Sequence, residues 1–219
     1  MLTSLSVAQL TSYVAAQLGA LLPDGRSIDS TALRAHVERA LERTERCFAR
    51  VRIKNFARDG QPCFSHLHTD QYAMFLYLLS HTVLRAERYP VLASKVYGLN
   101  KALHAIDAFY EVELPEVFFF QHPVGTVLGR AVYGNGFVVY QRCSTGSNLD
   151  SAAPVIGEGV VMFGGSAIIG RCTVGANAWL SVGTVVMDAD VPADAVAFGQ
   201  PPQNVFKPSS HRGSDFVFL

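Results

Sequence analysis

Several features are scarce in this 219-residue sequence, and each scarcity excludes a class of protein. The 18 Lys and Arg residues are balanced by 18 Asp and Glu residues, so the chain lacks the basic excess typical of nucleic-acid binders and polybasic membrane surfaces. The longest uninterrupted apolar run, Tyr72 to Leu79, is too short to cross a bilayer. The first residues lack the basic start and small-residue cleavage site of a signal peptide. These absences predict a cytoplasmic protein with no membrane span and no nucleic-acid partner.

Cysteine is scarce as well, and its spacing is uninformative. Cys47, Cys63, Cys143 and Cys172 lie far apart in the sequence, and no two of them form a C-x-x-C pair. This pattern favours small buried thiols in a reducing compartment over a disulfide framework or a thiolate zinc site. We therefore expect no bound metal.

Charge and glycine are unevenly distributed along the chain. Residues 1–120 carry 25 charged residues and only four glycines, whereas residues 121–219 carry 11 charged residues and 14 glycines. A shift of this size indicates a change of architecture.

The first half has helical periodicity. From Ser30 onward, apolar residues recur every three or four positions with Arg and Glu between them, which is typical of an amphipathic helix. Ser30 and Thr69 are candidate N-caps, and Pro90 would stop the helix that follows Thr69. Helices are predicted over about 5–18, 30–51, 70–88 and 91–110.

The second half has a six-residue period. Steps of six reach apolar residues only: Ile156, Met162, Ile168, Val174, Leu180 and Val186, after which Pro192 and Phe198 close the series. An earlier run has the same step in another phase: Val127, Tyr133, Val139 and Thr145. A non-repeating loop must separate the two runs, and residues 148–154 are the candidate.

A six-residue step fits neither an α-helix nor an alternating strand. It predicts short strands joined by tight corners, with one inward side chain per unit and glycine at the corners. Three units make a triangular coil, and stacked coils bury a continuous aliphatic column. A β-sandwich rich in glycine turns is the alternative, which six consecutive apolar residues in frame disfavour.

At these residues the chain resembles the hexapeptide-repeat acyltransferases, which fold as a left-handed parallel β-helix, and among them most resembles serine O-acetyltransferase. The resemblance rests on the helical first half, on His122-Pro123 followed by Gly129-Arg130, and on the closing segment VPADAVAFGQPPQNVFKP. It covers residues 118–208 well and the helical half in general design.

The resemblance implies an α+β protein with three parts. These are an α-helical domain at residues 1–117, a left-handed β-helix acyltransferase domain at 118–208 and a C-terminal tail at 209–219. It also implies acetyl-CoA as co-substrate and a homotrimer or higher oligomer with active sites between subunits.

The chain departs from the serine acetyltransferase pattern in three places. The family has Asp-Ile-His-Pro where this chain has Phe120-Gln121-His122-Pro123, so the carboxylate that orients the catalytic base is missing there. The family's Asp-His-Ala-Thr-Gly segment, with its catalytic histidine, is replaced by a shorter segment around Asn135. The Arg-His pair that holds the serine carboxylate is absent from residues 148–154. Either the acceptor is not serine or other residues bind it.

Acetyl transfer to a hydroxyl needs a base that works near neutral pH, and histidine suits this role. Within the second half of the chain, only His122 and His211 are available, and His211 lies in a polar tail. His122 is therefore the predicted catalytic base; the alternative is that it only packs against Pro123.

A second polar cluster lies at the start of a predicted helix. Residues 65–71 include His68 and Asp70, which could hold a polar acceptor or simply cap the helix. Of the other histidines, His81 and His104 are expected at the edge of the core and His36 in solvent. The predicted substrate-binding residues are His68, Asp70, Asn135, Tyr140 and Gln141.

Acetyl-CoA is expected to lie along a coil edge, where small residues permit close approach. Trp179 is expected to face outward, against a ligand or another subunit. The predicted cofactor-binding residues are Gly164, Gly165, Ser166, Gly183, Thr184, Gln200, Pro201 and Lys207, the last as a phosphate contact.

The function predicted from the sequence is acetyl-CoA-dependent transfer of an acetyl group to the hydroxyl of a small acceptor, with His122 as general base. The acceptor could be serine, another amino acid, a sugar or a surface polysaccharide. The alternative is a non-catalytic trimeric β-helix module. A β-helical zinc enzyme would need three converging histidines, which the repeats lack, and the first half has no strand and glycine loop of a nucleotidyltransferase.

Overall fold

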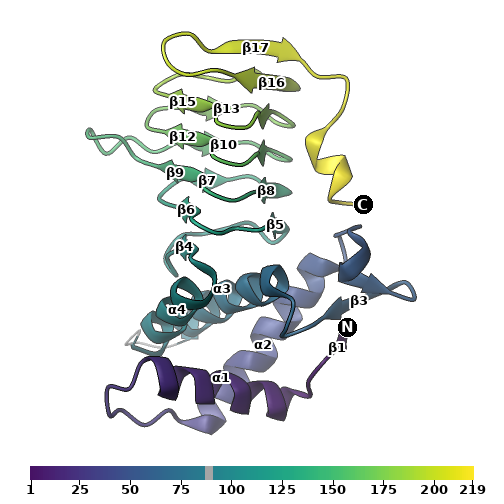
Figure 1. The fold of residues 1–219 in the computed structure, drawn as a ribbon, viewed down its shortest axis with the longest axis vertical. Helices are drawn as coiled ribbons and strands as arrows, with labels where there is room; N and C mark the ends of the chain where they lie inside the picture. Colours follow the sequence, from purple (N-terminus) through teal and green to yellow (C-terminus); the bar gives the residue numbers. More distant parts are fainter. Residues whose placement is uncertain (87–90) are drawn as a thin grey trace.

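Helices occupy one end of the chain and a column of short strands the other in the computed structural model, which describes residues 1–86 and 91–219 (Figure 1). The helical end begins with β1 (Leu2–Thr3) and contains α1 (Val7–Leu21), α2 (Ser30–Phe48), the 3-10 turn η1 (Lys54–Phe56), the hairpin β2 (Ala57–Arg58) and β3 (Gln61–Phe64), α3 (Thr69–Ala86) and α4 (Val91–His104).

The helix boundaries follow from local capping. Ser6 and Gln9 form a capping box at the start of α1. Asp29, not the predicted Ser30, caps α2, because its carboxylate accepts the N–H groups of Thr31 and Ala32. Helix α3 begins at Thr69, one residue before the predicted start, so Thr69 is its first residue and not its N-cap; the predicted stop at Pro90 lies outside the described residues.

Two helices end earlier than their periodicity predicts. Helix α2 ends at Phe48 and not at Val51, which instead bridges to Phe218. Helix α4 ends at His104 and not at residue 110, because Ala105 has a φ of 52° and the chain then enters β4 (Asp107–Ala108). Contacts with the strand region therefore override helical propensity at both ends.

Helix α3 is the core of the helical half and also closes the end of the strand column. Its residues from Asp70 to Val83 are all buried. The ring of Tyr77 lies 5.5 Å from that of Phe118 and 6.4 Å from that of Phe120. The two halves therefore share one hydrophobic core.

The second half is a parallel β-solenoid. Its strands are β5 (Phe118–Phe120), β6 (Val127–Leu128), β7 (Val132–Tyr133), β8 (Phe137–Val139), β9 (Ser144–Gly146), β10 (Val155–Ile156), β11 (Val161–Met162), β12 (Ala167–Ile169), β13 (Thr173–Val174), β14 (Trp179–Leu180), β15 (Val185–Met187), β16 (Ala195–Phe198) and β17 (Val205–Pro208). They form three sheets in the orders β15-β12-β9-β6-β4, β13-β10-β7 and β17-β16-β14-β11-β8-β5.

All pairings in these three sheets are parallel except that of β16 with β17. The predicted triangular coil is confirmed, and the β-sandwich alternative is wrong. The architecture is consistent with the left-handed β-helix of hexapeptide-repeat proteins.

The six-residue frame predicts the solenoid interior with errors at both ends. All six residues from Ile156 to Val186 in the main run are at most 1% exposed. In the earlier run, however, Val127 is 44% exposed and Leu128 points inward, at 1%. At the far end, Val191 and Ala197 are buried instead of Pro192 and Phe198. The predicted loop between the runs is confirmed: it leaves the column between β9 and β10 (Figure 1).

The C-terminal tail folds back beside the solenoid and reaches the helical half (Figure 1). It contains the 3-10 turn η2 (Gly213–Phe216). The N–H of Arg52 donates to the carbonyl of Val217, and the N–H of Leu219 donates to the carbonyl of Arg50. The tail therefore ties the end of the solenoid to the segment between α2 and η1.

Other sequence-based expectations have mixed outcomes. All four cysteines are free, and three are buried. The domain boundary after residue 117 stays a prediction, although β4 already pairs with β6 of the solenoid. No helix in the described ranges is long and apolar enough to cross a membrane. A cytoplasmic location stays a prediction.

Candidate functional site

One corner of the solenoid brings together six of the fourteen predicted site residues. The register pairs Phe120 with Val139, Val139 with Met162 and Met162 with Leu180. The residues that follow these strands are therefore stacked above one another. We call residues 121–123, 140–142, 163–165 and 181–183 the corner column.

His122 lies at the helical end of the corner column with an uncommon backbone conformation. Its φ is 50°, in the left-handed region, and its side chain is 73% exposed. A non-glycine residue in this region costs about 1–2 kcal/mol. The following Pro123 and a bond from the N–H of Val124 to the carbonyl of His122 maintain this turn, which points the imidazole outward.

The carboxylate that the sequence comparison finds missing beside His122 comes from the helical half. Oδ2 of Asp70, in the first turn of α3, lies 3.5 Å from Nδ1 of His122. The Asp70 side chain is only 6% exposed. A carboxylate buried at this distance from an imidazole favours a proton on Nδ1 and stabilises the charge formed when Nε2 takes up a second proton.

The other ring nitrogen of His122 faces the neighbouring side chain. Nε2 lies 2.9 Å from the side-chain nitrogen of Gln121. With Nδ1 protonated toward Asp70, Nε2 accepts this hydrogen bond and carries the basic lone pair. Sequence reasoning missed Gln121; counting back one coil from Tyr140 would have placed it in the same corner.

Two of the predicted acceptor residues, Tyr140 and Gln141, lie in the corner column one coil above His122. The Tyr140 ring is 4.9 Å from that of Phe163, and burial raises the pKa of its hydroxyl. The Gln141 amide lies over Gly164, where a Cβ atom would be 2.6 Å from its Nε2. The absence of a side chain at Gly164 therefore leaves room for this amide.

Asn135 and His68 have other surroundings. Asn135 is on a different corner, after β7, and its side-chain oxygen accepts the N–H of Val117. The His68 ring packs 5.5 Å from that of Phe56, not against His122. The structure therefore does not place His68 and Asp70 against a common neighbour.

The predicted cofactor residues divide into three groups. Gly164, Gly165 and Gly183 belong to the corner column, and a Cβ on Gly183 would meet nothing within 4 Å. Ser166 and Thr184 are 0% and 1% exposed, inside the solenoid, so only their backbone could approach a ligand from outside.

The third group lies at the far end of the solenoid from His122 (Figure 1). Gln200 and Pro201 are exposed beyond β16. Nζ of Lys207, on β17, lies 5.7 Å from the centre of the Phe198 ring. The predicted contacts of these residues with a cofactor stay predictions.

Trp179 faces outward as expected and is covered by the tail. Its ring lies 5.5 Å from that of Phe163, and its Cβ lies 3.6 Å from where a Cβ on Gly213 would stand. The tail of the same chain therefore packs against this residue, and the expected contact with a ligand or another subunit stays a prediction.

The remaining histidines belong to the helical core. His81 and His104 are 4% and 9% exposed, as their helix positions predict, and burial lowers the pKa of each to about 4. His36 was expected in solvent, but it is 6% exposed, because it lies on the inner face of α2. No cluster of three or more metal-ligating side chains occurs in residues 1–86 and 91–219.

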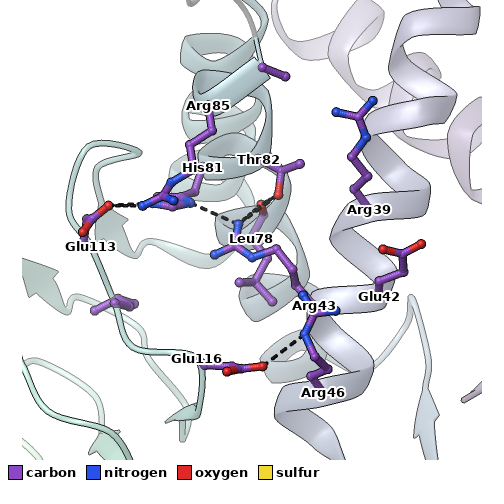
Figure 2. Close-up of a pocket in the computed structure, with 12 residues that line it drawn as sticks. Arg39, Glu42, Arg43, Arg46, Leu78, His81, Thr82, Arg85, Glu113 and Glu116 are labelled. Atoms are coloured by element: carbon purple, nitrogen blue, oxygen red, sulfur yellow. Dashed lines mark hydrogen bonds and ion pairs between the residues drawn. The ribbon is translucent and has the colours of Figure 1, made fainter.

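A charged pocket of about 580 Å³ between α2, α3 and the segment before β5 was not anticipated (Figure 2). Arg85 pairs with Glu113, and Arg46 pairs with Glu116 at 3.1 Å. Arg43 donates to the carbonyl of Leu78 and to the hydroxyl of Thr82. These contacts tie the helices to the start of the solenoid, and we assign the pocket a structural role.

Comparison with known proteins identifies serine acetyltransferases as relatives. No protein-family model matches the chain. The serine acetyltransferase of Synechococcus elongatus is 27% identical over 143 residues, which are 62% of this chain and 58% of that protein. Serine acetyltransferase 2 of Arabidopsis thaliana is 29% identical over 154 residues, 66% of this chain and 47% of that protein. The matched region thus spans about half the length of these relatives.

Solved structures of serine acetyltransferases share the fold. The crystal structure of the Brucella abortus enzyme has a TM-score of 0.71 at 18% identity, covering 93% of this chain and 84% of that one. A serine acetyltransferase in complex with CoA has a TM-score of 0.66 at 17% identity, covering 93% and 85%. The helical half and the solenoid are therefore arranged as in these proteins, which supports the predicted α+β fold.

Proposed function

We propose that this protein is an acetyl-CoA-dependent O-acetyltransferase with His122 as its general base. The observation that carries the proposal is the contact between Asp70 and His122 at the foot of a corner lined with glycines. The serine acetyltransferase relatives and the CoA complex of a structural neighbour support the same chemistry.

In the proposed reaction, Nε2 of His122 takes the proton of the acceptor hydroxyl as its oxygen attacks the thioester carbonyl. Asp70 holds Nδ1 and stabilises the imidazolium that forms. The carbon–sulfur bond then breaks, and the imidazolium returns its proton to the departing thiolate. Gln121 maintains the ring orientation until the acceptor displaces its amide from Nε2.

The corner column above His122 suits an extended thioester arm. Gly165 and Gly183 are stacked, each with a φ near 74°, and the space outside them is open. The acetyl end would lie beside His122 and Gln141, whose amide could donate to the developing oxyanion. The exposed end near Lys207 would accept the nucleotide portion. We propose no metal in this reaction.

We propose a small hydroxylated acceptor, with serine as the first candidate because of the relatives. The departures around Asn135 and in residues 148–154 keep a sugar or polysaccharide as the second candidate. We also propose a trimer or higher oligomer located in the cytoplasm. The sheet that contains β7 and β10 exposes Val132 and Val155, at 62% and 47%, on an outer face that a neighbouring subunit would cover.

The test is an acceptor screen monitored by release of free thiol from acetyl-CoA. The panel contains serine, homoserine, nucleotide sugars and oligosaccharides, with a no-acceptor blank. We expect acceptor-dependent thiol release by the wild-type protein. Light scattering on a size-exclusion column measures the oligomeric state.

The alternative, a non-catalytic trimeric module, predicts a different outcome. It would show no heat of acetyl-CoA binding in titration calorimetry and no thiol release with any acceptor. Saturable binding together with acceptor-dependent release excludes the module, and the absence of both would overturn the transferase proposal.

A further inference from the structure

A cavity of about 700 Å³ lies in the helical half, outside the corner column. It is bounded by β1, η1, the β2–β3 hairpin and the start of α3. Figure 1 shows these elements together, beside the N-terminus and at the helical end of the molecule. The charge and hydrogen bonding of its wall indicate the kind of molecule that it binds.

The cavity wall carries positive charge without compensating carboxylates. Lys54 and Arg58 both line it, and none of its thirteen described lining residues is Asp or Glu. Neither cation forms an ion pair with any residue of the described ranges. Asp59, next to Arg58 in sequence, is at the hairpin turn and not in the wall. Two unpaired cations at one cavity attract an anion.

One residue of the cavity wall, Gln71, is buried and fixed by two hydrogen bonds. Gln71 is 1% exposed, accepts the N–H of Ser65 at 2.7 Å and donates to the carbonyl of Asn55 at 2.8 Å. The first bond holds the segment before α3, and the second joins α3 to η1. The positions from which Lys54 and Arg58 extend are therefore held with respect to α3.

His68 adds an unpaired polar atom to the same wall. Its Nδ1 is buried, and no partner for it exists within residues 1–86 and 91–219. A buried polar atom without a hydrogen bond costs about 1–3 kcal/mol. Such atoms in native proteins are usually satisfied by a water or ligand, and a polar group on a bound molecule would supply the missing partner.

From these observations we propose that the cavity binds a small molecule carrying a carboxylate or phosphate group. Lys54 and Arg58 hold the anionic group, since charge-assisted hydrogen bonds are the strongest available there. His68 and the hydroxyls of Ser4 and Ser65 line the remainder of the site. This inference does not depend on the transferase proposal, because none of these residues belongs to the corner column.

The test is titration calorimetry of the full chain at low salt, with inorganic phosphate and malonate as separate probes and no acetyl-CoA. We expect saturable binding that weakens as salt is added. A preference for phosphate or for malonate identifies which anionic group the site prefers. Binding of neither probe would overturn the proposal.

Matched variants locate the binding. Lys54→Gln and Arg58→Gln should each weaken binding at least about five-fold, because each removes one charge-assisted contact. Arg171→Gln removes an exposed cation of the solenoid and should leave binding unchanged. Equal affinities in Arg58→Gln and Arg171→Gln would show non-specific anion association and would overturn the proposal.

A third variant tests the imidazole. His68→Phe keeps a ring beside Phe56 but removes both ring nitrogens, and it should weaken binding without lowering thermal stability. Circular dichroism confirms that each variant is folded before its titration is interpreted. Unchanged binding in His68→Phe would remove His68 from the site, and unchanged binding in all three variants would refute the assignment to this cavity.

Discussion

The two halves of this protein are stabilised by different means. The helical half carries most of the charged residues and buries several titratable groups, including His81, His104 and Asp70. The solenoid has few charges, and its coils are held by backbone ladders around an aliphatic column. Charge placement therefore matters most in the first half, and close backbone packing in the second.

The candidate site lies where these two halves meet. The solenoid supplies His122 on a strained turn and the open glycine edge above it. The helical half supplies the buried carboxylate of Asp70. The charge-poor solenoid has few ionisable groups of its own, so the carboxylate of the proposed site comes from the helical half. Four experiments test this division.

The largest effect is expected at the junction itself. His122→Ala should lower acceptor-dependent thiol release by about 10²–10⁴-fold, because it removes the proposed general base. His211→Ala, in the exposed tail, is the matched control and should retain wild-type activity. Wild-type activity in His122→Ala would falsify the assignment of the base.

Close packing in the solenoid is tested by a pair of glycine substitutions. A Cβ on Gly175 would lie 2.3 Å from the backbone nitrogen of Ala193, whereas a Cβ on Gly146 would meet nothing within 4 Å. Gly175→Ala should therefore destabilise the protein by roughly 2–4 kcal/mol through overpacking and backbone displacement. Gly146→Ala should leave the melting temperature nearly unchanged, and similar melting temperatures for the two variants would contradict this account.

The contribution of the helical half to catalysis is tested by Asp70→Asn. The amide keeps the size of the side chain but cannot stabilise an imidazolium, so we expect kcat to fall by about 10–100-fold. Asp150→Asn, on the exposed loop, is the control. Wild-type kcat in Asp70→Asn would contradict the proposed role of this carboxylate.

The smallest effect concerns acid stability of the helical half. Burial lowers the pKa values of His81 and His104 from 6.5 to about 4, so the unfolded chain binds more protons than the folded one between these values. Stability should therefore be complete above about pH 6.5 and be lost as pH falls toward 4, by about 1–2 kcal/mol per histidine at pH 5.

Denaturant unfolding at pH 7.5 and at pH 5 measures this effect. His104→Gln should reduce the pH dependence, because a neutral amide replaces a group that must stay deprotonated in the fold. His211→Ala should not change it, since His211 is exposed. An equal pH dependence in wild type and His104→Gln would refute the explanation.

Local sequence signals predicted the fold well where a period repeats and poorly where it stops. The run from Ile156 to Val186 identified the solenoid interior without error, because each coil repeats the same environment. The prediction that Val127 points inward was wrong, because the first coil packs against the helices and Leu128 is the buried residue there. The predicted end of α4 was wrong because β4 pairs with β6, and no local sequence pattern encodes this contact.

The candidate site was predictable only in part, for the same reason. His122, Tyr140, Gln141 and the glycines could be found because the repeat places them at equivalent positions in successive coils. Asn135 occupies a different corner, and Gln121 was overlooked although the register places it beside Tyr140.

The sequence by itself determined the helical first half, the solenoid and the choice of His122, because these follow from periodicity and from the scarcity of histidine in the repeats. Only the tertiary structure decided that Asp70 faces His122, that His36 is buried and that the tail returns to the helical half. Asp70 lies on a helix and His122 at a corner of the solenoid, so no sequence period relates the two positions. The contact exists because α3 docks its buried first turn against the first corner of the solenoid, which is a property of packing and not of local sequence.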